Sequence, residues 1–297
     1  MILTLFMKQI FRYRGKDYSQ KDIDFINQLI QQNPNDSRWA LSKKLCQRWG
    51  WVQPNGALRD MVCRSFMLEL DRAGLIKLPP KKGFPPNPLA NRKMPTQCHV
   101  DQTTISAKLS QITPLSIYQV RRTDKEKLCN SLIEQFHYLN YCQPVGEHLK
   151  YLVLTNDRPI ACFTWSSAPR HIGCRDKYIG WNVNDRKSNI HLIAYNSRFL
   201  ILPWVKVKFL ASHLLSQMAK RISEDWNKLY NHPIYFLETF VDTEKFVGIS
   251  YQAANWQYLG KTKGRGKNDH THKVNRSIKA VYGYPLIPNF RTRLRSR

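Results

Sequence analysis

A proline-rich, basic segment at residues 79–98, PPKKGFPPNPLANRKMPTQC, interrupts the sequence. Proline lacks a backbone N–H and restricts φ, so a run this dense in proline forms neither a regular helix nor a central strand. The segment therefore predicts a semi-extended linker between two domains. The chain has 297 residues, of which 42% are hydrophobic, and this is enough for two separate cores. We expect one domain over residues 1–78 and a second over 99–297.

The residues before the linker show the periodicity of a small helical domain. Apolar residues recur at helical spacing within 19–30, 37–49 and 58–70, and the extended segment LIKLP follows the third stretch. Three helices followed by an extended segment predict a helix-turn-helix or winged-helix-like DNA-binding domain, whose third helix presents Arg59 and Arg64 to a groove. The alternative is a small helical interaction domain whose charges are only solvated.

The charge of the chain indicates the chemistry of its partner. Lysine and arginine number 47 against 21 acidic residues, a formal net charge of +26. Such an excess favours a polyanion, most often nucleic acid, and an anionic membrane surface is the rival. No apolar stretch reaches the roughly 18 residues of a transmembrane helix. The seven cysteines are scattered without a C-x-x-C pair, as in a protein with reduced thiols, so we expect a cytoplasmic protein that contacts DNA and no membrane.

Strand-like and helix-like periodicities alternate after the linker. Strands are expected at 116–122, 190–202, 233–242 and 279–286, helices at 124–141, 205–226 and 243–256, and a hairpin that turns at 156–157. This order predicts an α/β or α+β domain, in which a mixed sheet carries helices on its faces.

Two resemblances narrow this expectation. The order of elements, together with VDTEKFVGISYQAANWQYLGKT at 241–262, is similar to GNAT-type N-acetyltransferases, which implies a GNAT-like mixed sheet with flanking helices. Separately, GEHLKYLVL (146–154), IACFTWSSAPRHIGCRDKYIGW (160–181) and NSRFLILPWVKVKFLASHLL (196–215) resemble the DruA family, as does RWALSKKLCQRWGW near the front. That family occurs in Druantia anti-phage defence systems and beside mobile elements. The resemblance implies a DNA-acting protein whose other partners are defence-system or mobile-element proteins.

This sequence lacks the glycine-rich turn that binds coenzyme A in GNAT-type enzymes. Those enzymes place a glycine-rich turn before a helix, so that bare amides reach the pyrophosphate of coenzyme A. The corresponding residues here are KVKFLAS at 206–212, where Phe209 stands near the first glycine position. We therefore expect no acetyl-CoA binding. Lys206 and Lys208 keep positive charge near the helix start and suit a nucleic-acid phosphate.

Acidic residues near strand ends suggest metal-dependent chemistry on DNA. Glu238 and Asp242 lie at i and i+4 of a predicted strand and share one face. With Asp176, Asp185 or Glu147 they form a candidate Mg²⁺ site for nuclease-like or transposase-like processing of DNA strands. The alternative is that Asp242 only caps the helix that follows.

Two other sets of residues are candidates for chemistry. Tyr251, with Glu147 or Glu238, can supply an acid and a base for acetyl transfer, unless Tyr251 is an ordinary half-buried aromatic residue. The HTH motif at 270–272, with tyrosines at 282–284, resembles single-strand nucleases that use a histidine pair and a tyrosine, but a flexible polar loop is the alternative.

Two basic segments of the second domain are expected to contact DNA. The segment 175–189, expected as a loop, mixes cations with Tyr178 and Trp181, and cations beside aromatic rings suit unpaired DNA. The alternative is a solvated loop anchored by one buried tryptophan. From 261 onward the sequence is strongly basic, although such a run is often only solvated. The cations expected at DNA in this domain are Arg175, Lys177, Arg186, Lys206, Lys208, Lys261, Lys263, Arg265 and Lys267.

The sequence thus predicts a DNA-acting, DruA-like protein. It binds DNA through the helical N-terminal domain and the basic C-terminal surface, and a metal-dependent step with Mg²⁺ on DNA strands is included in the hypothesis. A GNAT-type acetyltransferase and a noncatalytic adaptor of a defence complex are the two alternatives.

Overall fold

The computed structural model describes residues 11–14, 16–53, 56–81, 83, 94–264, 274 and 276–295. The chain divides into two compact units. The first comprises Met1–Asn91 with Asn227–His232, and the second comprises Arg92–Trp226 with Pro233–Arg297. Among the described helices, none combines the length and the apolar character needed to cross a bilayer.

The first unit contains the three helices that the periodicity predicts. They are α1 (Gln20–Gln31), α2 (Arg38–Arg48) and α3 (Asp60–Arg72), preceded by a hairpin of β1 (Phe11–Tyr13) and β2 (Lys16–Tyr18). Ser19 and Asp22 form a capping box at α1, and Ser37 accepts a hydrogen bond from the Ala40 N–H at α2, so helix starts follow from local sequence. After α3, residues 75–80 form no strand within the described chain, so the wing expected there is not present at that position.

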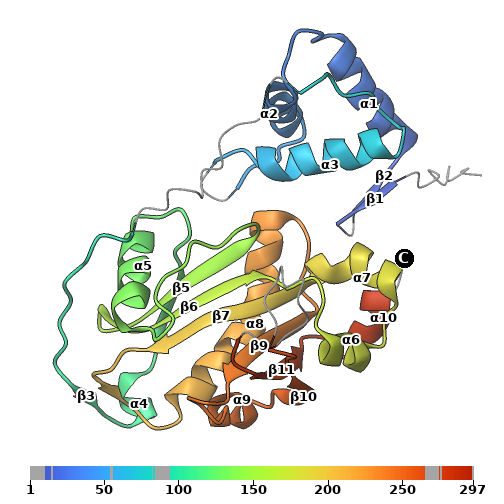
Figure 1. The fold of residues 1–297 in the computed structure, drawn as a ribbon. Helices are drawn as coiled ribbons and strands as arrows, with labels where there is room; N and C mark the ends of the chain where they lie inside the picture. The colour runs from blue at the N-terminus through green and yellow to red at the C-terminus, as the bar shows by residue number, and fades with distance from the viewer. Residues whose placement is uncertain are drawn as a thin grey trace, which may run out of the picture. The chain divides into compact units, whose positions relative to one another are not determined.

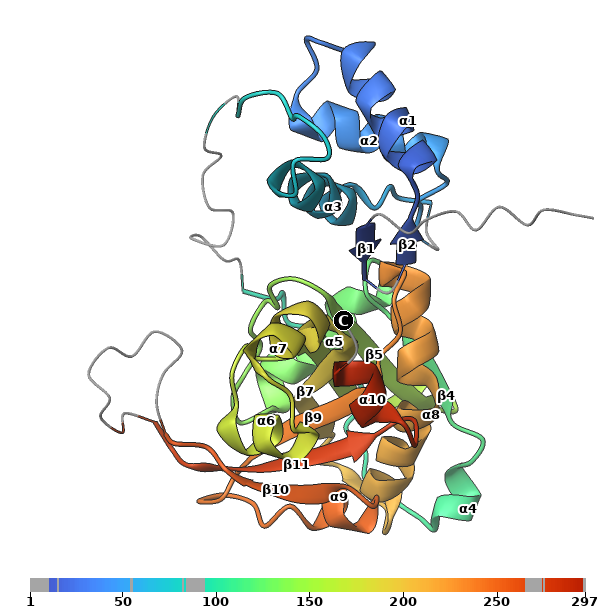
Figure 2. The ribbon, with the colours of Figure 1, turned by 90° about the vertical axis from the view of Figure 1, so that its right-hand side faces the viewer.

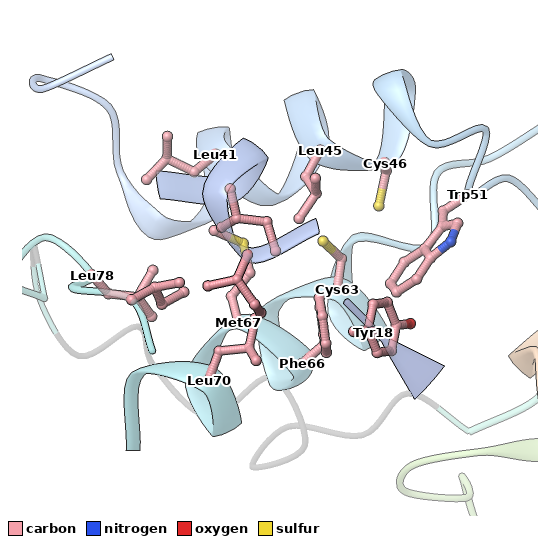
Figure 3. Packing of buried hydrophobic residues seen from close by; sticks show 13 residues of the cluster. Tyr18, Leu41, Leu45, Cys46, Trp51, Cys63, Phe66, Met67, Leu70 and Leu78 are labelled. Atoms are coloured by element: carbon pink, nitrogen blue, oxygen red, sulfur yellow. The ribbon is translucent and has the colours of Figure 1, made fainter. Parts of the chain in front are cut away.

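The core of the first unit lies between its three helices. Figure 3 shows Leu41, Leu45 and Cys46 of α2 directed toward the buried face of α3, with Tyr18 and Trp51 closing one end. Tyr18 and Phe66 lie with ring centroids 4.3 Å apart. Each fully buried apolar side chain of this kind stabilises the fold by about 1.5–3 kcal/mol relative to exposure.

The second unit is built on a seven-stranded mixed sheet, shown in Figure 1. Its strands lie in the order β10-β11-β9-β7-β6-β5-β4, and only β7 and β9 are parallel neighbours. The strands of this sheet are β4 (Ser116–Gln119), β5 (His148–Thr155), β6 (Arg158–Ser167), β7 (Ile193–Ile201), β9 (Phe236–Asp242), β10 (Gln257–Lys261) and β11 (Lys279–Pro285). The helices of the unit are α4 (Leu109–Ile112), α5 (Lys125–Phe136), α6 (Gly173–Ile179), α7 (Val183–Asn189), η1 (Ile190–Leu192), α8 (Leu210–Tyr230), α9 (Ile249–Ala253) and α10 (Phe290–Arg295). A short parallel pair, β3 (Ile105–Ser106) and β8 (Val205–Lys206), lies apart from the sheet.

Consecutive residues of β5 show which helices cover which face. The Lys150 ammonium donates to Glu126 and Asn130 of α5, whereas the Tyr151 hydroxyl donates to Asp225 of α8. Neighbouring side chains on a strand point to opposite faces, so α5 and α8 cover opposite faces of the sheet. In Figure 2, α6 and α7 lie to the left of the sheet and α8 to the right.

The predicted mixed sheet with flanking helices is confirmed, as is the predicted hairpin turn, and there are two local differences. The hairpin turn falls at Asn156 and Asp157, whose φ values of 45° and 60° are those of a tight hairpin turn. The segment 175–189, predicted as a loop, forms most of α6 and α7, and the helix predicted at 243–256 is only the short α9. Gly248 with a φ of 82° precedes α9, so the helix begins later than its apolar pattern suggests.

Candidate functional site

The sheet opens between its two parallel strands. β7 and β9 pair only over Ile193–Asn196 and Phe236–Thr239. Beyond these residues β7 continues to Ile201 and β9 to Asp242, and a cavity of about 560 Å³ lies where they separate. We call this space the β7–β9 cleft. Each strand keeps its other neighbour, β6 or β11, so backbone groups on the two facing edges are directed into the cleft.

Aromatic and cationic side chains line the β7–β9 cleft. The aromatic residues are Phe136, Tyr138, Tyr195, Phe199, Phe240, Phe246 and Tyr251. The cations are Arg198, Lys245 and Lys279, and no described lining residue is a carboxylate. The cleft is therefore largely apolar with cations in its lining, a combination that suits a flat anionic ligand.

Exposed apolar side chains gather at the rim of the cleft. They are Tyr138, Leu139, Phe246, Val247 and Ile249, and their exposed fractions range from 37% for Tyr138 to 76% for Val247. Exposed apolar residues scattered singly are ordinary, but a group of them around one opening indicates a binding site.

Tyr251 lies at the floor of the cleft on the side of α9. Its hydroxyl donates to Oδ1 of Asn196 at 2.7 Å, and the Thr239 hydroxyl lies 3.4 Å from it. Burial raises the pKa of Tyr251 well above its ordinary value, so the phenol stays neutral and remains a hydrogen-bond donor. The residue proposed as an acid for acetyl transfer thus lies in the cleft, where it also packs against Tyr282 and Trp256.

A buried ion-pair network lies on the face of β9 opposite to Thr239. Nη1 of Arg175 donates to both carboxylate oxygens of Glu238, at 3.1 and 3.2 Å, and neither side chain is exposed. Nη2 of Arg175 lies 2.8 Å from Oδ1 of Asp176, an oxygen that also accepts from Trp181. Oδ2 of Asp176 binds His171 at 2.6 Å and Arg186 at 3.1 Å. This network holds α6 against the sheet.

The pKa values of the two acids in the network are shifted in opposite directions. Burial raises the pKa of Glu238 to about 7, although the adjacent Arg175 opposes the shift. Burial also acts to raise the pKa of Asp176, but Arg175 and hydrogen bonds from Trp181 and His171 outweigh it and lower that pKa overall.

The carboxylates proposed as Mg²⁺ ligands are not brought together. Glu238 and Asp242 lie on one strand four residues apart, a separation of about 13 Å at roughly 3.3 Å per residue. Ligands of a single Mg²⁺ lie about 2.1 Å from the ion, so these two cannot share it. Glu238 is bound by Arg175, and Asp242 accepts hydrogen bonds from Ser277 Oγ and the Glu244 N–H.

The other acids considered as ligands have structural partners as well. Asp176 belongs to the ion-pair network, Asp185 closes the capping box of α7 with Asn182, and Glu147 lies 3.4 Å from the Trp226 indole N–H. Within the described part of the chain, no three His, Cys, Asp or Glu side chains are close enough to hold a metal ion. The residues present do not fit a Mg²⁺ site.

The predicted DNA-contacting cations divide into buried and exposed groups. Arg175, placed by the sequence on a DNA-facing loop, is 0% exposed because Glu238 and Asp176 hold it inside, so this expectation is corrected. The Arg186 guanidinium forms an ion pair with Asp176 at 3.1 Å. The exposed cations are Lys177 on α6, Lys206 and Lys208 before α8, Lys261 and Lys263 at the end of β10, and Arg64 on α3.

Three of the remaining predicted positions need separate mention. Arg59 is the half-buried residue before α3, and its Nε donates to the Val52 carbonyl at 2.9 Å. Arg265 and Lys267, like the HTH motif at 270–272, lie outside the described residues.

The segment expected to replace a glycine-rich turn has an unusual backbone. Phe209 has a φ of 65°, in the left-handed region that favours glycine, and its side chain is 78% exposed. Lys206 takes part in the β3–β8 pairing just before it. The chain therefore keeps a glycine-like conformation at this position without the glycine.

Sequence reasoning missed most residues of the cleft. Tyr138 was predicted within a helix, but α5 ends at Phe136 and His137 has an extended backbone. Phe246 and Lys245 fall within a predicted helix that the structure does not form before Ile249. The available signal was the cation–aromatic pair within TEKFVG, directly after a buried strand.

The open pair of parallel strands lies within a seven-stranded mixed sheet with flanking helices, an arrangement that resembles the GNAT fold. Solved structures that align with part of the chain include the ribosomal-protein-S18-alanine N-acetyltransferase from Escherichia coli, at 12% identity and a TM-score of 0.35, covering 58% of this chain and 94% of that one. A GNAT-family acetyltransferase from Streptococcus pneumoniae aligns at 12% identity and a TM-score of 0.38, covering 58% of this chain and 98% of that one. No curated protein matches the sequence.

The particular family is defined by the sequence itself. Residues 89–295 match the family described as Druantia protein DruA. Because the match spans well over half of the chain, the chain belongs to the DruA family, and this membership suggests a role in defence.

Proposed function

We propose that this DruA-family protein binds nucleic acid, and specifically DNA, as its part in a defence system in the cytoplasm. The observation that carries the proposal is the distribution of charge between interior and surface. Among the residues that the structure describes, five acids are buried, whereas two lysine or arginine side chains are. The buried acids are Glu147, Asp176, Asp185, Glu238 and Asp242, and the buried cations are Lys150 and Arg175.

This distribution makes the surface more positive than the composition alone requires. Negative charge that folding places inside cannot neutralise cations on the outside, and the chain already carries a formal charge of +26. Lysines exposed near the end of β10, before α8 and on α6 are available for phosphate contacts in the second unit. In the first unit, Arg64 of α3 is exposed, and the Lys43 ammonium lies 4.2 Å from the Trp39 ring centroid.

The proposal is one of binding and contains no metal-dependent cleavage. Glu238 and Asp242 lie on one strand with about 13 Å between their positions, and the Glu238 carboxylate is bound by Arg175. The protein then acts on DNA by holding it, together with other proteins of the defence system or of a mobile element.

The test is a titration of fluorescently labelled DNA with the full chain at salt concentrations from about 50 to 200 mM. Each phosphate contact releases counterions, so log K must fall linearly with log salt, with a slope close to −0.9 per contact on a duplex. We expect a steep slope of several units on duplex DNA. An affinity that is absent at low salt, or flat across the range, contradicts the proposal.

A second candidate function is acetyl transfer from coenzyme A. The position of Tyr251 at the floor of the β7–β9 cleft favours it, because the neutral phenol can protonate a leaving thiolate. Calorimetry with coenzyme A separates the two functions. The DNA-binding proposal predicts no heat of binding, and acetyl transfer requires micromolar-to-millimolar affinity.

A further inference from the structure

We propose that the β7–β9 cleft binds one unpaired nucleotide of a nucleic-acid strand, with the base inside the cleft and the phosphate at Lys245 and Lys279. This inference rests on the proposed nucleic-acid binding. It adds that one nucleotide of the bound strand enters the β7–β9 cleft. Every nucleotide offers the chemistry that the cleft would recognise, a planar base joined through a sugar to a phosphate.

The walls of the cleft suit a flat ring with polar edges. Tyr195 and Glu238 are register partners of β7 and β9 on one face of the sheet, and Asn196 and Thr239 are partners on the other. Lining residues come from both sets, so the cleft passes between the strands and is walled by their open edges. Backbone N–H and C=O groups on such edges need partners, and the donors and acceptors on the edge of a base can provide them. A volume of about 560 Å³ lies within the usual range for small-ligand pockets.

Phe246 is the stacking surface in this arrangement. Its side chain is 49% exposed at the rim, an area that a base can cover. The rings of Phe246 and Tyr138 lie 5.1 Å apart at 60°, so the edge contact fixes the position of Phe246. Tyr138 is itself held by His137, whose ring stacks on it at 4.8 Å. Stacking of a base on an aromatic residue is favourable for every base, so this surface does not require a particular sequence.

The cations of the cleft have different tasks. The Arg198 guanidinium donates to the carbonyls of Asn140 and Ser197, so it fixes the segment after α5 and is not free for a ligand. Nζ of Lys245 lies 5.0 Å from the Tyr138 ring centroid and is exposed beside Phe246. Lys279 lines the cleft from β11. A phosphate next to a base on Phe246 can therefore meet the ammonium of Lys245.

The neutral state of His137 leaves the charge of the cleft to these lysines. Burial lowers the pKa of His137 to about 4, so the imidazole is uncharged near neutral pH. Its Nδ1 accepts a hydrogen bond from the Leu139 N–H at 3.1 Å, which requires that this nitrogen carries no proton.

The first experiment compares variants of the full chain on a 12-nucleotide single strand and on the duplex of the same sequence. Phe246→Ala removes the stacking surface, and Phe246→Trp restores one. Tyr118→Ala is the matched control, because Tyr118 is 43% exposed and carries Lys125 over its ring at 5.6 Å, outside the cleft. Lys245→Ala and Lys125→Ala form the corresponding pair for charge.

We expect Phe246→Ala to weaken single-strand binding about tenfold or more, the loss that follows from one base–aromatic stack. Duplex binding should change less than twofold, Phe246→Trp should recover the single-strand affinity, and Tyr118→Ala should leave both unchanged. Lys245→Ala should reduce the salt slope on the single strand more than Lys125→Ala does. If Phe246→Ala and Tyr118→Ala behave alike while DNA still binds, the inference is wrong and the proposed function remains.

A second measurement uses the wild-type protein and does not depend on how a variant folds. A single strand that contains one 5-iodouracil is photocrosslinked, and the attached peptides are sequenced. Crosslinks within 136–139 or 240–251 support the inference, and crosslinks confined to other segments overturn it. Free dTMP is expected to compete with the single strand for these crosslinks. Displacement of the single strand by coenzyme A or by an extended uncharged peptide at a lower concentration than dTMP requires would overturn the inference and assign the cleft to that ligand.

Discussion

Arg175 and Glu238 form an ion pair that is entirely buried, with Nη1 of the arginine 3.1 and 3.2 Å from the two carboxylate oxygens. The pair joins α6 to the middle of β9, two elements more than 60 residues apart in the chain. The sequence predicted a catalytic role for Glu238 and DNA contact for Arg175. In the structure, the two residues connect a helix to the sheet. Its energetics can be measured directly.

Glu238→Ala should destabilise the protein strongly. Removal of Glu238 leaves Asp176 as the one carboxylate that compensates the buried Arg175 charge. Loss of a partner from a buried ion pair costs about 3–5 kcal/mol when no other partner remains, so we expect a loss of up to this size. The free energy of unfolding from urea titration, followed by the loss of tertiary signal, measures the effect. Asp101→Ala is the control, because Asp101 in the Asp101–Arg158 pair is 54% exposed, and the unfolding midpoint of this variant should scarcely move. Equal stability of Glu238→Ala and wild type would show that the pair is not structural.

The pH dependence of stability should carry the signature of Glu238. Its pKa is raised from 4.5 to about 7 in the folded protein, so the folded state binds this proton more tightly than the unfolded state does. The stabilising contribution is therefore complete below about pH 4.5 and is lost as pH rises through about 7. Glu238→Gln cannot ionise, and the difference in unfolding free energy between it and wild type should shift in favour of the variant over this range. A constant difference would mean that Arg175 keeps Glu238 ionised throughout.

Phe209→Gly should be more stable than Phe209→Ala by about 1 kcal/mol. The residue has a φ of 65°, which glycine adopts freely and a residue with a Cβ adopts at a cost. Because the phenyl ring is 78% exposed, its removal loses little buried surface in either variant. Thermal unfolding of the two variants side by side provides the comparison. An alanine variant as stable as the glycine variant would show that the strain is absent in solution.

Lys261 and Lys263 should contribute to the salt dependence of DNA binding. Both are exposed at the end of β10. Replacement of both by alanine should lower the slope of log K against log salt by about 1 for each lost phosphate contact. Replacement of both Lys125 and Lys127 by alanine, which removes two exposed lysines of α5, is the charge-matched control and should leave the slope nearly unchanged. An identical slope in the double variant and the wild type would place the DNA elsewhere on the protein.

Local sequence was sufficient for much of the fold. Ser37 caps α2 because its hydroxyl reaches a backbone N–H three residues later, an interaction that involves only neighbours. Asn156 and Asp157 tolerate the left-handed conformation of a tight turn, and the turn joins β5 and β6 as expected. Such features depend on residues close in the chain, and for this reason they can be read without a structure.

The candidate site was far less accessible to such reasoning. The cleft is lined by residues from the ends of α5, β7 and β9 and from the start of β11, segments that no local pattern connects. The acids Glu238 and Asp242 share a face, as alternation predicts, but a sequence does not show that a partner such as Arg175 occupies one of them. The cation–aromatic pair Lys245 and Phe246 is visible in the sequence, but its contact with Tyr138, more than 100 residues away, is not.

The sequence by itself determined the order of helices and strands, the excess of positive charge and membership of the DruA family, because these depend on composition and on neighbours along the chain. Only the tertiary structure decided which charges are buried and where the sheet opens. Burial of a charge depends on whether a distant partner such as Arg175 can compensate its lost hydration, and that partnership exists only after α6 and β9 meet.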